Sequence, residues 1–194
     1  MFHFSNLKWT PLQAHTIGIP QLTQETLGLK EEELGDLAAV IRRAKEAFGL
    51  EGLFTGALAS VYQKSRVERI CKDLDLECIS PLWGTDTEQY MRQLVKNGFV
   101  SIVVSVSALG LDRRWLGRVL DDAAIDELVA LSGKFRFHAG LEGGEGETFV
   151  LDCPLFRETI EVVRAETRWK GDSGTYEILD ARLVPKPNPR VGEA

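Results

Sequence analysis

Stretches with helical spacing alternate with very short apolar runs in the first eighty residues, and this alternation constrains the fold more than any other feature. Apolar residues keep helical spacing over 31–48 and again over 62–74. Short apolar runs follow these stretches at Leu53–Thr55 and at Cys78–Ile79, as expected of buried strands. Helices that alternate with continuously apolar strands indicate a parallel sheet covered by helices. The sequence therefore predicts an α/β unit in this part of the chain.

The pattern changes near Pro81–Asp86, after which strands predominate. The strongest strand signal in the chain is Phe99–Val106, and only extended segments are expected beyond residue 148. The change predicts two units, 1–83 and 84–184, and the proline-rich residues 185–194 are expected to form a disordered tail. The other predicted elements are helices over 11–16, 87–96 and 121–131, a strand or turn over 17–20, and extended segments over 149–151, 159–163 and 176–183.

Composition argues against several classes of protein. The net charge of −6 disfavours a nucleic-acid-binding surface, because affinity for phosphates comes from clustered Lys and Arg. The three cysteines, Cys71, Cys78 and Cys153, form no C-x-x-C pair and indicate reduced intracellular thiols rather than disulfides or a zinc site. The longest apolar run, Phe99–Leu111, is short and interrupted by serines, so it is not expected to span a membrane. No secretory signal is recognisable at the N-terminus. We therefore expect a cytoplasmic protein without membrane or nucleic-acid partners.

A glycine-rich acidic segment between Gly140 and Pro154 is the most informative stretch for function. Glycines let a backbone approach a ligand closely, and loops of this kind aim carboxylates and backbone N–H groups into clefts. The segment predicts recognition of a cationic or amine-bearing group, or positioning of a metal; a solvated acidic hairpin connection is the alternative. The candidate substrate-binding residues are Glu142, Gly143, Gly144, Glu145, Glu147, Thr148 and Asp152.

A turn of small residues leads from the strand at 53–55 into the helix over 62–74. Open α/β sheets bind ligands at the carboxyl ends of their strands, and the start of a helix favours anions. The turn and the first helical turns therefore predict a ligand site, whereas tight strand–helix packing with a solvated Arg66 is the alternative. The candidate ligand-binding residues are Gly56, Ala57, Leu58, Ser60, Gln63 and Arg66.

Two further clusters follow the strong strand. The small residues over 105–111 break the strand, and Ser107 there is a candidate phosphate or loop anchor. Arg118, in the arginine-rich stretch 113–118, is a second candidate for the same role. A solvated charged turn is the alternative for the other arginines of that stretch. His138 is interpreted as a hydrogen-bonded structural residue.

Five motifs in this order resemble the diphthine–ammonia ligase family, which belongs to the N-type ATP pyrophosphatases of the adenine nucleotide alpha-hydrolase superfamily. The resemblance extends over nearly the whole chain to about Arg182. The motifs are G-A-L-A-S-x-Y-Q-x-x-R at 56–66, P-L-W at 81–83, V-S-A-x-G-L at 106–111, W-L-G-R at 115–118 and E-G-G-E-x-E-T-F-V-L-D-x-P at 142–154.

The resemblance implies a HUP-type (Rossmann-like) parallel sheet, N-terminally incomplete, followed by a smaller α+β domain. It implies an ATP-dependent carboxylate–ammonia ligase that uses ATP with Mg²⁺ and no resident metal. It also implies that the ligand-binding candidates over 56–66 are nucleotide-binding residues. Its protein substrate would be translation elongation factor 2, whose diphthine is amidated to diphthamide through an acyl-adenylate, with release of pyrophosphate and AMP. A homo-oligomer is compatible with this family. The quaternary ammonium of diphthine suits the carboxylates of Glu142, Glu145 and Glu147.

Two departures from the family pattern matter. The family's S-G-G-K-D-S loop, which binds phosphate, does not occur in this sequence. We therefore expect the chain alone to bind ATP weakly and to have impaired activity. The sequence would then be a fragment, the product of a mis-started reading frame or a degenerate form of the family. Gly146 stands where the family usually has an aromatic residue. The alternatives are another N-type ATP pyrophosphatase that amidates a small carboxylate metabolite, and a non-catalytic protein-binding relic of the fold.

Overall fold

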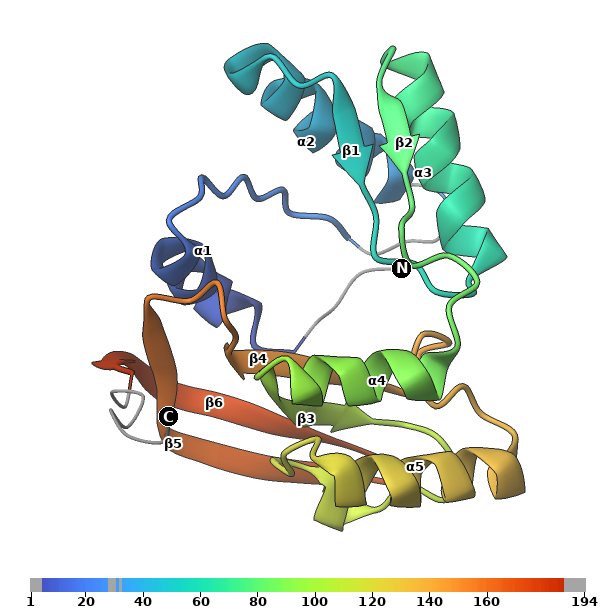
Figure 1. The fold of residues 1–194 in the computed structure, drawn as a ribbon, viewed down its shortest axis with the longest axis vertical. Coiled ribbons are helices and arrows are strands. Elements are labelled where there is room, and N and C mark those ends of the chain that lie inside the picture. The colour runs from blue at the N-terminus through green and yellow to red at the C-terminus, as the bar shows by residue number, and fades with distance from the viewer. Residues whose placement is uncertain (1–4, 28–30, 32, 187–194) are drawn as a thin grey trace, which may run out of the picture. The chain divides into compact units, whose positions relative to one another are not determined.

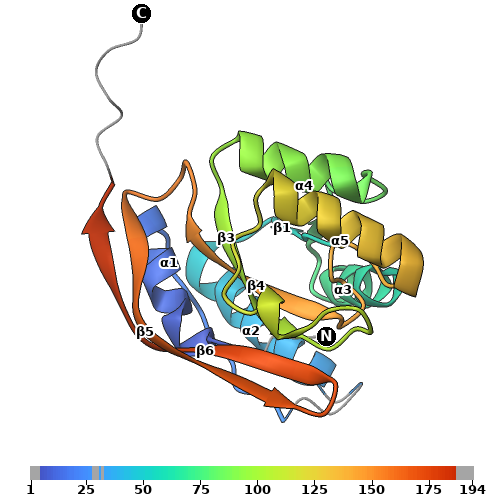
Figure 2. The same cartoon turned by 90° about the horizontal axis from the view of Figure 1, so that it is seen from below.

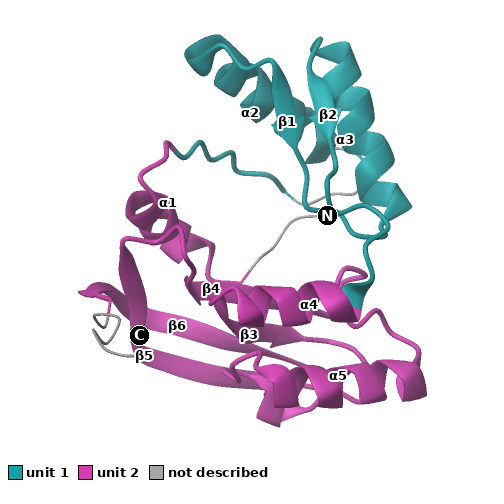
Figure 3. Cartoon of the chain, viewed as in Figure 1, with its two compact units in different colours: residues 1–3, 21–87 teal, residues 4–20, 88–194 magenta. Residues whose placement is uncertain are grey.

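The computed structural model describes residues 5–27, 31 and 33–186, which form two compact units (Figures 1 and 3). The parallel unit comprises residues 21–87, and the antiparallel unit comprises 5–20 and 88–186. Helix α1 (Thr10–Ile17) therefore packs with the later part of the chain. The sequence predicts that one functional domain ends at residue 83 and that the next begins at residue 84, and this boundary stays a prediction.

The described residues of the parallel unit form two helices and two strands: α2 (Glu33–Phe48), β1 (Gly52–Phe54), α3 (Val61–Asp73) and β2 (Glu77–Ile79). The strands pair in parallel with Leu53 opposite Cys78. Ile41 of α2 packs with Ile70 and Cys71 of α3 in a small apolar core. The helical spacing of apolar residues seen in the sequence thus corresponds to the buried faces of both helices.

The antiparallel unit is built on a four-stranded sheet in the order β4-β3-β6-β5. Its strands are β3 (Val100–Val106), β4 (Gly146–Asp152), β5 (Glu158–Lys170) and β6 (Ser173–Pro185). Its helices are the 3-10 helix η1 (Leu7–Trp9), α1 (Thr10–Ile17), α4 (Thr87–Lys96), the 3-10 helix η2 (Arg113–Trp115) and α5 (Asp122–Phe135).

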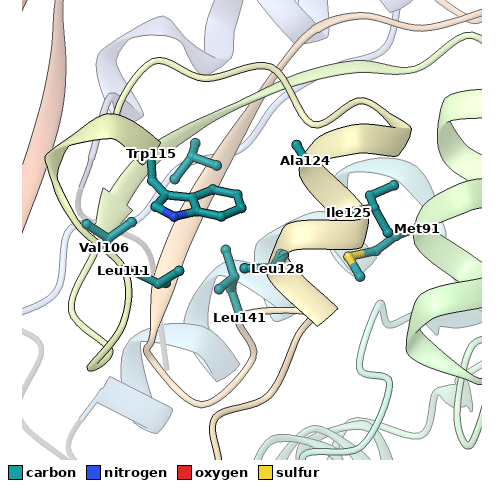
Figure 4. Packing of buried hydrophobic residues seen from close by; sticks show 9 residues of the cluster. Met91, Val106, Leu111, Trp115, Ala124, Ile125, Leu128 and Leu141 are labelled. Atoms are coloured by element: carbon teal, nitrogen blue, oxygen red, sulfur yellow. The ribbon is translucent and has the colours of Figure 1, made fainter. Parts of the chain in front are cut away.

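Helices cover both faces of this sheet (Figure 2). Helices α4 and α5 bury Met91, Ile125 and Leu128 against Val103 and Val106 on one face, with the indole of Trp115 at the centre of the cluster (Figure 4). On the opposite face, η1 and α1 pack against a second apolar cluster, whose buried members are Ile102, Val104, Phe149, Cys153, Phe156, Ile160 and Ile178. The strand β3 contributes alternate residues to the two cores, which explains why its sequence is almost continuously apolar.

Side chains near the N-terminus form hydrogen bonds with β5 and β6 and so hold η1 and α1 against the antiparallel sheet. Asn6 is buried, donates from Nδ2 to the Tyr176 carbonyl (2.9 Å) and accepts from the Ile178 N–H at Oδ1 (2.8 Å). Thr16 makes a similar pair of hydrogen bonds with the backbone of Glu158. Both side chains therefore satisfy strand groups that would otherwise be buried without partners.

The structure confirms a mixed α/β fold with a parallel sheet and an antiparallel sheet, but the parallel sheet has two strands among the described residues and is not by itself a HUP fold. The antiparallel unit was expected to be the smaller, and this was wrong, because α1 and the long β5–β6 hairpin belong to it. Of the strand or turn expected over 17–20, Ile17 is the last residue of α1, Gly18 ends the helix with φ 81°, and residues 19–20 are irregular. Of the predicted tail 185–194, Pro185 is the last residue of β6 and Lys186 forms an ion pair with Asp152, whereas residues 187–194 lie outside the described residues. No helix in the part of the chain that the structure describes is both long and apolar enough to cross a membrane.

Candidate functional site

A pocket of about 210 Å³ lies at the carboxyl end of β1, beside the first turn of α3. This strand-end pocket is wholly within the parallel unit. Because parallel strands present their carboxyl ends at one edge of the sheet, this is the edge at which open α/β folds bind ligands. Its lining residues are Leu37, Leu53, Phe54, Thr55, Gly56, Ala57, Gln63, Lys64 and Val67.

Hydrogen bonds hold the segments around the strand-end pocket in place. The hydroxyls of Thr55 and Ser80, which follow the two strands, are 3.0 Å apart. The Gly84 N–H donates to the Leu58 carbonyl (2.9 Å), so the loop after β2 is tied to the turn after β1. Ser60 caps α3 by accepting from the Gln63 N–H at its hydroxyl. The pocket is therefore bordered by an ordered turn and by a capped helix start.

The nucleotide-binding candidates divide between the pocket and its surroundings. Gly56, Ala57 and Gln63 line the pocket, whereas Ser60 acts as the helix cap and the Leu58 side chain is buried. The side chains of Leu58 and Ser60 thus stabilise the fold and do not line the pocket.

Arg66 is not among the residues that line the strand-end pocket. Its guanidinium lies 3.5 Å from the centre of the Tyr62 ring and forms an ion pair with Glu31. The hydrogen bond to Glu31 raises the pKa of Arg66. Tyr62 and Arg66 are four residues apart and share one helix face, while Gln63 and Val67 share the adjacent face toward the pocket. The role of Arg66 in nucleotide binding stays a prediction.

Phe54 and Lys64 are two of the pocket residues that the sequence reasoning did not select as site candidates. Phe54 is 72% exposed although it is a large aromatic residue at a strand end. Lys64 lies within the G-A-L-A-S-x-Y-Q-x-x-R motif, directly after Gln63, but it was not among the predicted ligand-binding residues. The proximity of Lys64 to the start of the helix was a signal that could have identified it.

The acidic loop, residues 140–147, is stabilised by one of its own carboxylates. Glu145 accepts from the Gly143 N–H (2.6 Å) and from the His138 N–H (3.1 Å). A Cβ at Gly143 would lie 2.5 Å from the Glu145 carboxylate, so any other residue there would make this carboxylate shift from its hydrogen-bonded position. The loop also contains Leu141 in the left-handed conformation (φ 60°), with its side chain buried in the core. Glu145 therefore shapes the loop.

Replacing Glu145 with glutamine should lower the free energy of unfolding of the antiparallel unit by about 1–3 kcal/mol, because a charged acceptor of two backbone N–H groups is lost. Denaturant unfolding measures this change. The matched control is Glu166→Gln, which removes the same charge from an exposed pair with Arg168 and should cost at most about 1 kcal/mol. Equal effects of the two substitutions would show that Glu145 does not stabilise the loop.

Ser107 joins the acidic loop to the end of β3. Its hydroxyl donates to the Gly144 carbonyl (2.6 Å), and its N–H donates to the Glu145 carbonyl (2.7 Å). Arg118, the other candidate anchor, forms an ion pair with Glu127 and lies 4.5 Å from the Trp115 ring. The geometry thus places Ser107 against the loop and directs Arg118 toward α5.

The other acidic candidates have separate environments. Glu147 accepts from the Ser5 N–H (2.9 Å). Glu142 lies near Tyr90 of α4, and burial together with this carboxylate raises the pKa of Tyr90. Asp152 accepts from the Thr159 hydroxyl and forms an ion pair with Lys186. Because Asp152 is at the opposite end of β4, about 20 Å along the strand from the loop, the structure does not bring it together with the glutamates. Thr148 lies within β4, opposite Val103.

Metal coordination receives no direct support from the acidic residues. Among residues 5–27, 31 and 33–186, no three His, Cys, Asp or Glu side chains group closely enough to hold a metal ion. Cys71, Cys78 and Cys153 are free thiols. Among the acidic-loop carboxylates, Glu142 acts electrostatically on Tyr90 of α4, whose pKa is raised by burial and by this charge.

Comparison with known proteins identifies related sequences on both units. Residues 1–78 match the family model described as the diphthamide synthase N-terminal domain, and residues 86–184 match the diphthamide synthase C-terminal domain.

Several curated relatives are named diphthine–ammonia ligase. The protein from Schizosaccharomyces pombe is 39% identical over 182 residues, which cover 92% of this chain and 30% of the relative. The protein from Homo sapiens is 40% identical over 136 residues, which cover 70% of this chain and 51% of the relative. The protein from Saccharomyces cerevisiae is 30% identical, and the match covers 83% of this chain and 25% of the relative. The chain thus spans between a quarter and about half of the length of these relatives.

Proposed function

The chain belongs to the diphthamide synthase family, and from this premise we propose that it takes part in ATP-dependent amidation of diphthine. ATP activates the diphthine carboxylate as an acyl-adenylate, with release of pyrophosphate. Ammonia then attacks the acyl carbon, loses a proton, and displaces AMP to leave the amide. The protein supplies positioning and charge stabilisation, since no protein nucleophile is needed.

The strand-end pocket is our candidate for the adenine nucleotide. Its volume of about 210 Å³ is smaller than the roughly 300–1,000 Å³ typical of ligand pockets, so it would hold one part of the nucleotide. A Cβ added at Gly56 would meet no atom within 4 Å, which leaves open space beside the backbone at the strand end. The exposed ring of Phe54 offers an apolar surface for a base. Magnesium would be held mainly by the nucleotide phosphates.

The acidic loop is our candidate for recognising the cationic diphthine side chain. The charge of Glu142 acts on the phenol of Tyr90, and a carboxylate and an aromatic ring are the two kinds of group that attract a quaternary ammonium. Glu145 and Ser107 would act indirectly, because their hydrogen bonds hold the loop in shape. We further propose that the protein substrate is elongation factor 2, that the reaction occurs in the cytoplasm, and that the two units divide the work between nucleotide and substrate.

The observation that carries this proposal is the strand-end pocket in a chain whose two parts match both domains of one ligase family. The test is a replacement in cells that lack their diphthine–ammonia ligase. This chain is inserted into the human relative in place of the matched segment, and diphthamide on elongation factor 2 is measured by mass spectrometry. Restored diphthamide supports the proposal. A stable, abundant hybrid that leaves only diphthine would refute it and favour a non-catalytic role.

A further inference from the structure

The strand-end pocket contains a single cationic group in a fixed position. Among the described residues that line it, Lys64 is the only one with a charged side chain. Lys64 is the fourth residue of α3, so its stem rises from the first turn of the helix beside the strand end. A nucleotide that entered this pocket would bring negatively charged phosphates near this ammonium.

Trp83 and Glu68 hold the Lys64 side chain. The ammonium lies 5.2 Å from the centre of the Trp83 ring, within the range of a cation–π contact. It also forms an ion pair with Glu68, one helical turn further on, and the two side chains are 24% and 44% exposed. Trp83 is itself positioned, because the adjacent Gly84 N–H is bonded to the Leu58 carbonyl. The Lys64 ammonium is therefore ordered before any ligand binds.

We infer that Lys64 contacts a phosphate group of the nucleotide in the strand-end pocket, with Trp83 as a positioning residue. The inference rests on the proposed nucleotide function of this pocket. Lysine binds phosphate as a compact point charge, and a pre-positioned ammonium loses little side-chain entropy on binding. Glu68 competes with the phosphate for the same ammonium. Since the Lys64–Glu68 pair is partly exposed, its disruption costs little.

The test compares AMP with adenosine, because these ligands differ only in the phosphate. Each is titrated into isotopically labelled full chain, and affinity is measured from NMR shifts, including the indole N–H of Trp83. Lys64→Gln should weaken AMP binding by about tenfold or more, as expected for loss of a charge-assisted contact, and leave adenosine binding unchanged. Lys64→Arg should retain most of the AMP affinity, and Glu68→Gln should increase it.

The matched control is Lys72→Gln, which removes the same charge from an exposed position on the same helix and should not change AMP binding. If the wild-type chain binds AMP and adenosine equally well, or if Lys64→Gln weakens both ligands equally, the phosphate contact is wrong while the nucleotide pocket stands. If the wild-type chain binds neither ligand, the proposed nucleotide pocket is itself wrong and the inference falls with it.

Discussion

Replacing Trp115 with alanine should lower the free energy of unfolding of the antiparallel unit by about 3–5 kcal/mol, the range for removing a large aromatic side chain from a core. Trp115 is 1% exposed and lies at the centre of the cluster formed by α4, α5 and β3 (Figure 4). It also lies beneath the Arg118 guanidinium, at 4.5 Å. The substitution therefore leaves a large cavity and removes a stacked partner. Urea unfolding followed by circular dichroism measures the loss.

The control for Trp115 is Leu155→Ala in the same unit, because Leu155 is 67% exposed. This change should alter the free energy of unfolding by no more than about 0.5 kcal/mol. A small effect at both positions would show that the indole does not fill the core. Because Trp115 is buried, it is also unsuited to direct contact with a partner protein.

Replacing Gly146 with alanine should destabilise the antiparallel unit by about 3 kcal/mol, near the upper end of the usual cost of overpacking. A Cβ at this position would lie 2.6 Å from the Ser105 carbonyl oxygen and 3.2 Å from a methyl carbon of Leu141. The first of these atoms belongs to the backbone of β3, so the strand must shift to make room. Gly146 pairs directly with Val106, and β3 has an irregularity in the same region, between Val103 and Ser105.

Gly133→Ala is an informative control because its expected effect has the opposite sign. Gly133 is exposed in α5, and a Cβ there would meet no atom within 4 Å. Alanine should raise the free energy of unfolding by about 0.5–1 kcal/mol through its higher helix propensity. Thermal unfolding of both variants gives the comparison. Destabilisation by Gly146→Ala of less than about 0.5 kcal/mol would show that β4 moves freely away from β3.

The elements of the fold were predictable where their apolar pattern was local. The spacing of Leu34 and Ile41 predicted α2, and the nearly unbroken apolar run of β3 followed from its burial on both faces. The strand β5 was underestimated as 159–163, because its second half alternates exposed charged residues with the half-buried Ala165, Thr167 and Trp169 and so lacks a continuous apolar run. The position of α1 depends on Asn6 binding a strand 172 residues away, a contact without a local sequence signal.

The location of the strand-end pocket was predictable from the sequence, but the contacts of the residues around it were not. Because open α/β sheets bind ligands at the carboxyl ends of their strands, Gly56 and Gln63 were expected at a ligand site. Both residues line a pocket in the structure. The partner of Arg66 is Glu31, 35 residues earlier, and this long-range pair could not be read from the motif. Similarly, a carboxylate in a glycine-rich loop can face a ligand or its own backbone. The Glu145 carboxylate faces the backbone, because it accepts hydrogen bonds from the N–H groups of His138 and Gly143.

The most direct test of ATP-dependent diphthine amidation is transfer of labelled nitrogen. The purified hybrid ligase that carries this chain is incubated with ATP, ¹⁵N-ammonium and elongation factor 2 that bears diphthine. The proposed function predicts ¹⁵N in the product amide and formation of AMP in equal amount, with neither product when ATP is omitted or when the factor lacks diphthine. A folded hybrid that binds ATP but forms neither labelled amide nor AMP would contradict the proposed function.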